Sequence, residues 1–291
     1  MALTREELAE EKADWPADAA VIEQARSLLR FAARNATVVA CDSDVDGLAA
    51  AVIVERALTT LGGAPHVLPA ARGEHVHHSY MLRRIHALRP SCLIVVDMGS
   101  RPQPILPGTP TLIVDHHHAA AGVPPGAVLL NGYDRPPVAP SSVLAHVVCR
   151  TIPGNDSSAW LAALGAIADL GSAGPFRNVL GVRSGGGRWT RAAALLNAAR
   201  RADPPDAAVA LDLLRLASSV DDVISGILPQ TRVLEQYQQQ VRAEIDRCAR
   251  VPPRGSAATG STSRWSRSDT HAARSARSSG RAPPADSAPA G

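Results

Sequence analysis

Long apolar runs are absent from the 291-residue sequence. This absence excludes an ordinary membrane-spanning helix, which needs about 20 consecutive apolar residues. The first residues, Met1 to Glu7, also lack the basic-then-apolar order of a secretory signal peptide. With 45% hydrophobic residues, the chain can bury one large core or two modest ones. We therefore expect a cytoplasmic protein with no membrane partner.

Paired cysteine spacing and a strong excess of one charge are missing as well. Cys41, Cys92, Cys149 and Cys248 are dispersed, so neither a zinc knuckle nor a disulfide framework is indicated. The net charge is only +3, and the segment 254–291 alone carries six arginines against two aspartates. The rest of the chain is therefore close to neutral, and the charge gives no indication of a basic groove.

Metal-ligand residues, by contrast, occur in four clusters, and each cluster follows an apolar run. The clusters are Asp42-Ser43-Asp44-Val45-Asp46-Gly47, Asp97-Met98-Gly99, Asp115-His116-His117 and Ala168-Asp169. Carboxylate and imidazole together are typical of Mn²⁺ sites, whereas carboxylate alone favours Mg²⁺ or Ca²⁺. The four clusters together predict a divalent-metal hydrolase.

The first cluster follows Thr37–Ala40, a β-branched run typical of a buried strand. In an extended chain alternate side chains share a face, so Asp42, Asp44 and Asp46 are expected to point the same way. Three adjacent carboxylates repel one another unless a hard cation such as Mn²⁺ or Mg²⁺ lies between them. The glycine that follows is predicted to turn the chain tightly into a helix over 48–61.

Two other interpretations apply to this segment. Asp-x-Asp-x-Asp-Gly also opens the calcium loop of an EF-hand, but that loop needs an acidic residue at its twelfth position, which here is Ile53. An EF-hand loop also follows a helix, whereas this one follows a predicted strand. The second interpretation, three acids that only cap a helix, remains open on this segment alone.

The next two clusters also follow apolar runs of strand length. Cys92–Val96 is an apolar run that ends at Asp97, and Thr111–Val114 leads into the Asp-His-His cluster. In open parallel α/β sheets, ligands bind at the carboxyl ends of the strands, so these ends are expected to meet in one crevice. A helix of small residues over 160–168 is predicted to pack close to the sheet and to bring Asp169 into the same crevice.

The order Asp-x-Asp-x-Asp-Gly, Asp-x-Gly, Asp-His-His and Gly-x-Ile-Ala-Asp resembles that of the DHH phosphoesterase superfamily, in its RecJ-like branch, over roughly residues 37–172. The resemblance implies an α/β fold with a parallel sheet flanked by helices. It also implies a hydrolase that cleaves phosphodiester bonds of single-stranded nucleic acid or short oligonucleotides. The attacking water would be activated by two Mn²⁺ ions, with Mg²⁺ as the alternative metal.

The resemblance also assigns roles to the matching positions. It implies five ligands for the two ions: Asp44, Asp46, Asp97, His116 and Asp169. Asp97 would bridge the ions, and Asp42 would be a further ligand or an outer partner. Asp115 would orient a histidine, and His117 would contact the scissile phosphate or assist proton transfer. His118 is outside the motif and is expected to be exposed.

The sequence predicts four segments. They are an N-terminal helical extension (1–36), the DHH catalytic domain (37–172), a helical segment (173–250) and a disordered tail (251–291). The superfamily usually has a further C-terminal domain with a Gly-rich, His-containing motif, and no such motif follows Gln230. A second hypothesis is therefore a metal-binding but catalytically impaired remnant or regulatory module.

Two further groups of residues are left open by the sequence. The stretch 72–78 contains three histidines and an arginine, and it suits an extra metal site, a substrate-contacting loop or an inert surface loop. Arg200 and Arg201 end a predicted helix over 192–201, where they suit a nucleic-acid contact or a solvated face equally well.

Overall fold

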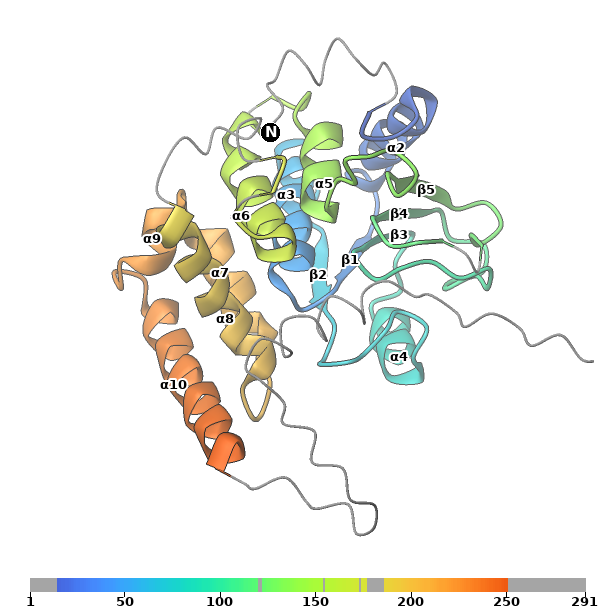
Figure 1. The fold of residues 1–291 in the computed structure, drawn as a ribbon. Helices are drawn as coiled ribbons and strands as arrows, with labels where there is room; N and C mark the ends of the chain where they lie inside the picture. Colours follow the sequence, from blue (N-terminus) through green and yellow to red (C-terminus); the bar gives the residue numbers. More distant parts are fainter. Residues whose placement is uncertain (1–14, 120–121, 154, 173, 177–185, 251–291) are drawn as a thin grey trace, which may run out of the picture. The chain divides into compact units, whose positions relative to one another are not determined.

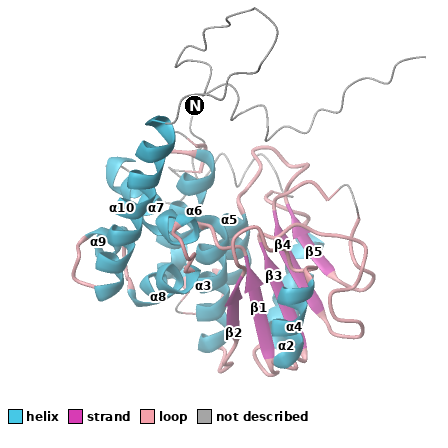
Figure 2. Ribbon diagram, turned by 90° about the horizontal axis from the view of Figure 1, so that it is seen from below, coloured by secondary structure: helices cyan, strands magenta, loops and turns pink. Residues whose placement is uncertain are grey.

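The computed structural model describes residues 15–119, 122–153, 155–172, 174–176 and 186–250. Its centre is a parallel sheet with strand order β2-β1-β3-β4-β5 (Figure 2). The strands are β1 (Thr37–Cys41), β2 (His66–Pro69), β3 (Cys92–Val96), β4 (Thr111–Asp115) and β5 (Val128–Asn131). The predicted α/β class, a parallel sheet flanked by helices, is confirmed.

The three central strands are buried along their whole length. Val39, Ile94 and Leu112 belong to one hydrophobic cluster, whereas the alternate residues Val38 and Leu93 belong to another. A strand buried on both faces has no polar side, which explains why the sequence shows continuous apolar runs there rather than an alternating pattern.

Helices cover both faces of this sheet (Figure 1). On one face lie α2 (Ala19–Ala32), α3 (Val45–Thr60) and α5 (Ser141–Cys149), whose side chains share a cluster with Val39. On the other lies α4 (Ser79–Ala87), which buries Met81 and Ile85 against Val38. The helix α6 (Ala159–Leu170) packs chiefly against α3 and α5. The expectation from the sequence is that it packs close to the sheet; its main contacts are with these two helices.

The remaining helices lie beyond α3 and α6. They are α7 (Gly186–Arg201), α8 (Ala207–Leu216), α9 (Val220–Ile224) and α10 (Pro229–Arg250). Leu196 of α7 and Leu211 of α8 are buried in the same cluster as α3. None of the described helices is long and apolar enough to cross a membrane. The predicted domain boundaries stay predictions, and the predicted tail 251–291 lies outside the described residues.

The structure differs from the sequence prediction at the start of α3 and at β2. The helix after the first cluster begins at Val45 rather than Leu48, so Asp46 is on its first turn and not on an extended strand. The strand β2 has no counterpart in the sequence prediction, because only two of its four residues are buried and the segment has no clear alternation. The four cysteines are all free, and of these Cys248 is exposed.

Candidate metal centre

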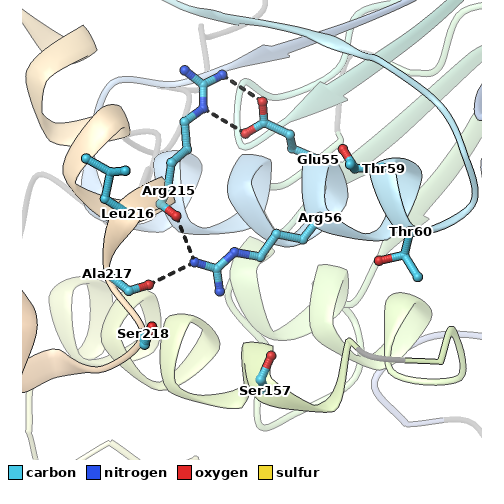
Figure 3. A pocket seen from close by; sticks show the side chains of 9 residues that line it. All are labelled: Glu55, Arg56, Thr59, Thr60, Ser157, Arg215, Leu216, Ala217 and Ser218. Carbon is cyan, nitrogen blue, oxygen red and sulfur yellow. Dashed lines mark hydrogen bonds and ion pairs between the residues drawn. The ribbon is translucent and has the colours of Figure 1, made fainter.

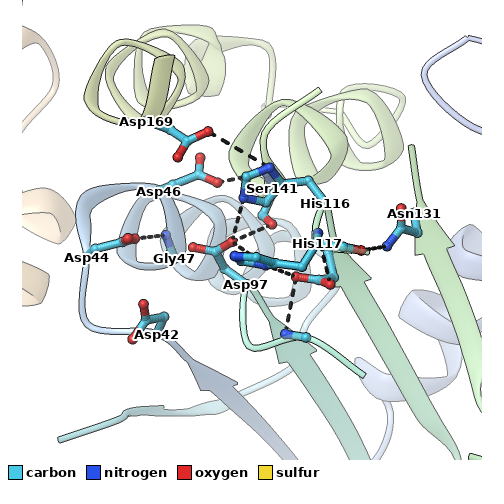
Figure 4. Close-up of polar contacts among 12 residues, drawn as sticks. Asp42, Asp44, Asp46, Gly47, Asp97, His116, His117, Asn131, Ser141 and Asp169 are labelled. Atoms are coloured by element: carbon cyan, nitrogen blue, oxygen red, sulfur yellow. Dashed lines mark hydrogen bonds and ion pairs between the residues drawn. The ribbon is translucent and has the colours of Figure 1, made fainter. Parts of the chain in front are cut away.

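The four sequence clusters come together at the carboxyl end of the sheet (Figure 4). Asp42 follows β1, Asp97 follows β3, and Asp115 is the last residue of β4. Asp46 comes from the first turn of α3 and Asp169 from the last turn of α6. Figure 4 shows the side chains of Asp46, Asp97 and Asp169 directed toward one region between the strand ends and the helices.

Asp46 is held by the N-terminus of a second helix. Its carboxylate accepts hydrogen bonds from the backbone N–H groups of Ser141 (2.8 Å) and Ser142 (3.1 Å), the first residues of α5. The Ser142 hydroxyl donates to the same carboxylate. Since helix N-termini carry partial positive charge, this carboxylate is fixed between α3 and α5. The two serines therefore do not cap their own helix, and the residue before α5 is Pro140.

Two glycines allow the close approach of these elements. A Cβ at Gly47 would lie 2.8 Å from the Asp42 carbonyl oxygen, so the helix start and the strand end could not approach as they do. A Cβ at Gly165 of α6 would clash with the Ser142 hydroxyl and lie 2.7 Å from Asp46 Oδ1. Gly47 is inside α3 rather than at a tight turn, and its role is steric rather than conformational.

Asp97 is nearly inaccessible to solvent and lies at the centre of the cluster. Its backbone φ is +62°, a left-handed conformation that only a few residue types adopt readily. One carboxylate oxygen, Oδ1, accepts a hydrogen bond from the Ser141 hydroxyl (2.9 Å) and lies 3.3 Å from His116 Nε2. Strained backbone of this kind concentrates at functional sites, where surrounding contacts hold it in place.

The two histidines of the third cluster have different surroundings. The ring of His116 is largely buried, and it lies between Asp97 and Asp169, with His116 Nδ1 3.9 Å from Asp169 Oδ2. The ring of His117 is 57% exposed, and His117 Nδ1 lies 2.8 Å from Asp115 Oδ1. Asp115 is fully buried and also accepts the backbone N–H groups of His117 (3.2 Å) and Gly99 (3.3 Å). Asp115 therefore fixes both the His117 ring and the loop that contains Gly99.

The carboxylates are held where ionisation is unfavourable. Burial raises the pKa of Asp46 to about 6, and Asp44 adds to the increase. Burial, followed by repulsion from Asp46 and Asp44, raises the pKa of Asp97 well above its usual range. Burial also raises the pKa values of Asp42 and Asp169. Such a cluster is costly without a counter-charge, and a divalent cation would supply one.

The Asp115–His117 pair shows the opposite behaviour. Burial is the largest single influence and would raise the pKa of Asp115, but the His117 hydrogen bond, the charges of His117 and His116 and the Gly99 N–H together lower it. The same hydrogen bond raises the pKa of His117. A carboxylate that accepts the ring hydrogen bond of a histidine fixes both the tautomer and the orientation of that ring.

Two groups of ligand atoms are close enough to hold a cation. Oxygen and nitrogen atoms of Asp97, His116 and His117 all lie within 4.8 Å of one another, and so do those of Asp42, Asp44 and Asp97. Asp97 is the member that the two groups share. Among the described residues, the histidines at positions 75, 77 and 78 form no such group, so the geometry gives no support to an extra metal site there.

Arg200 is a charged residue at this site that no sequence motif identifies. It comes from the end of α7, and its guanidinium lies 3.0 Å from Asp44 Oδ2 and 3.8 Å from Asp42 Oδ2. Of the two interpretations that the sequence left open for this residue, neither describes an ion pair with the first cluster. The packing of α7 against α6 and α3 brings the guanidinium there.

A cavity of about 550 Å³ lies beside the C-terminal half of α3 (Figure 3). Its cations already have partners. Arg56 donates to the carbonyl oxygens of Leu214 (3.1 Å), Arg215 (3.3 Å) and Ala217 (2.9 Å), at the end of α8. Arg215 makes two hydrogen bonds, each 2.8 Å long, with Glu55. These contacts attach α8 to α3, so we do not assign the reactive site to this cavity.

No protein-family model matches the sequence, and a search of curated proteins gives no match either. Solved structures do resemble it. An exonuclease RecJ bound to manganese has a TM-score of 0.62 and 22% identity, over 78% of this chain and 68% of that chain. RecJ from Thermus thermophilus in complex with Mn²⁺ has a TM-score of 0.59 and 21% identity, over 79% of this chain and 39% of that chain.

A third similar structure is the DHH domain of a member of the s1p family of ribosomal proteins. It has a TM-score of 0.57 and 16% identity, over 78% of this chain and 61% of that chain. The chain thus matches between 39% and 68% of the length of these three proteins. At these identities the likeness is one of fold.

Proposed function

The chain has the RecJ-like DHH fold, and we propose that it is a phosphoesterase that depends on divalent metal ions. The observation that carries the proposal is the place of Asp97 in two ligand groups at once. A carboxylate shared by two neighbouring groups suits a bridging ligand between two cations, the arrangement used in two-metal hydrolysis.

The residues present fit such ions. We assign the ligands to Asp44, Asp46, Asp97, His116 and Asp169, with Asp42 as a further ligand or outer partner. Asp42, Asp44, Asp97 and His116 belong to the two ligand groups, whereas Asp46 and Asp169 are assigned from their place beside these groups. The mixture of imidazole and carboxylate favours Mn²⁺, with Mg²⁺ as the alternative. The structures of RecJ that resemble this chain contain Mn²⁺ or Mg²⁺, which supports the choice.

When bound, two divalent cations lower the pKa of water and stabilise charge on the oxygens of a phosphoryl group. The chain would contribute the remaining groups. Asp115 occupies Nδ1 of His117, so Nε2 is the nitrogen left for a phosphate oxygen or a leaving oxygen. The raised pKa of His117 keeps the ring protonated to higher pH, which suits a proton donor.

Arg200 would act on the substrate rather than on the metals. Its guanidinium lies against Asp44 and Asp42, which are the carboxylates that a cation would neutralise. With those charges compensated, the guanidinium would be free to leave its ion pair. We assign it to a phosphate oxygen of the substrate, a group that arginine recognises in a two-point geometry.

Single-stranded nucleic acid or a short oligonucleotide is the proposed substrate. The likeness to an exonuclease RecJ supports this class. A cytoplasmic location is part of the same proposal.

The test is hydrolysis by the purified full chain with Mn²⁺. The panel contains single-stranded DNA, short RNA, a cyclic dinucleotide and pyrophosphate. We expect cleavage of one or both single-stranded nucleic acids, and abolition of that cleavage in Asp97→Asn. The matched control is Asp221→Asn, because that carboxylate is exposed on α9 and pairs with Arg188 instead.

Two outcomes would contradict the proposal. Near-normal cleavage by Asp97→Asn would remove the metal assignment. Confirmed Mn²⁺ uptake with no cleavage of any substrate would favour the second hypothesis, a metal-binding module without turnover.

A further inference from the structure

A second cavity lies near the carboxyl ends of β4 and β5. It has a volume of about 330 Å³ and lies between the start of α2 and the loops after β4 and β5. Pockets that hold small organic ligands have volumes of roughly 300–1,000 Å³, so this one is large enough for a single ring system. Its lining includes Asp18, Val21, His118, Asn131, Tyr133 and Arg135.

Two of the lining residues are an exposed, stacked pair of rings. The centroids of His118 and Tyr133 lie 4.7 Å apart, and the ring planes are inclined by 28°. Both residues are exposed, and Tyr133 has 43% of its surface accessible to solvent. An aromatic pair that is left exposed beside a cavity offers a flat apolar surface to another flat ring.

Hydrogen bonds connect the pocket lining to the backbone of His117. The side-chain amide of Asn131 donates to the His117 carbonyl oxygen (2.8 Å), and its oxygen accepts the Tyr133 backbone N–H (2.7 Å). His118 follows His117 directly, so their Cα atoms are only about 3.8 Å apart. A molecule in the pocket would therefore lie beside the backbone of His117.

Charged groups stand around the same opening. Asp18 precedes α2, and its carboxylate accepts the Ala20 N–H (2.8 Å) and lies 3.9 Å from the Arg135 guanidinium. Asp134 also lines the pocket. The pocket thus has an aromatic surface together with hydrogen-bonding groups at its edge, a combination suited to a heteroaromatic ring with polar edge atoms.

We propose that this pocket binds a nucleobase of the substrate, stacked on the His118–Tyr133 pair, in the nucleotide attached to the scissile phosphate. The proposal rests on the proposed phosphoesterase function, and it identifies the part of the substrate that the metal centre does not hold. Every base can stack on aromatic side chains. The pocket would therefore add affinity for the substrate and fix its position without a strong sequence preference.

The first experiment tests the pocket without any hydrolysis. 2-Aminopurine riboside has a fluorescent base and no phosphate, and stacking quenches its emission. We expect quenching by the wild-type chain that saturates with protein concentration. Tyr133→Ala should weaken this binding by about fivefold to 150-fold, while Tyr133→Phe keeps the ring and should remain close to wild type.

Phe31→Ala is the matched control. Phe31 is exposed to a similar extent, 42%, and is also aromatic. It lies ten residues after Val21 on α2, roughly 15 Å along the helix from the pocket. Binding of the riboside by this variant should equal that of the wild type.

The second experiment uses cleavage. Tyr133→Ala should raise KM for an intact oligonucleotide, and it should leave KM unchanged for one that is abasic at the nucleotide attached to the scissile phosphate. An equal change in KM for both substrates, or riboside binding that does not depend on Tyr133, would contradict the proposed nucleobase pocket. If the riboside binds through Tyr133 but no phosphodiester is cleaved, the pocket is upheld and the proposed phosphoesterase function fails.

Discussion

Binding of Mn²⁺ should weaken by at least about tenfold between pH 7 and pH 5, because the buried carboxyl group of Asp46 must first lose a proton. Its pKa is raised by burial to about 6. Below pH 6 most Asp46 carboxyl groups therefore carry a proton, and protons compete with the metal for the carboxylate in that range. An aspartate with the ordinary pKa of 3.8 would be ionised throughout and would cause almost no change.

The magnitude follows from the titration of one group. At pH 7 about one Asp46 in ten carries a proton, and at pH 5 about ten carry it for each that does not. Asp97, whose pKa is also raised well above its usual range, steepens the dependence in the same direction. Tenfold is therefore the lower bound of the expected loss.

Calorimetric titration of Mn²⁺ into metal-free protein at pH 5, 6 and 7 measures this loss. Repeating the titration in two buffers with different ionisation enthalpies counts the protons released, and we expect release at pH 6. The control is Asp46→Asn, whose affinity should be lower overall and should change about tenfold less over the same range. Affinity constant within twofold from pH 7 to pH 5, with no proton release, would refute the reasoning.

Three substitutions test other parts of the account. Gly165→Ala places a Cβ 2.7 Å from Asp46 Oδ1, and we expect a stability loss of about 1–3 kcal/mol in urea unfolding together with weaker Mn²⁺ binding; unchanged metal affinity would contradict this. Asp115→Asn replaces the carboxylate that accepts the His117 ring N–H with a neutral amide, so the charge that fixes the ring tautomer is lost, and kcat should fall by about 10- to 100-fold, with a shifted pH–rate profile. Arg56→Ala leaves three carbonyl oxygens at the end of α8 without their donor, and it should cost about 1–3 kcal/mol of stability while kcat per folded molecule stays unchanged.

The sequence is sufficient for most of the sheet. Strands that are buried on both faces must be continuously apolar, so Thr37–Cys41, Cys92–Val96 and Thr111–Asp115 can be located from composition alone. The edge strand β2 cannot be located in this way, since only Val67 and Leu68 are buried in it. The predicted start of α3 is three residues late, because acids before a helix look alike whether they precede it or begin it.

The contacts that hold the site are harder to predict than its motifs. Ser141 and Ser142 look like helix caps in sequence, yet their hydroxyls serve Asp97 and Asp46, residues 44 and 96 positions away. Arg200 reaches Asp44 because α7 packs against α6 and α3. Such contacts depend on tertiary packing, and no local pattern in the chain records them.

The central claim is that Asp97 lies between two cations held by side chains from the strand ends. The most direct measurement is an anomalous-scattering map of crystals grown with Mn²⁺. We expect two peaks roughly 3.5–4 Å apart, on either side of the Asp97 carboxylate. No peak within coordination distance of Asp97, or Mn²⁺ bound only at other residues, would contradict it.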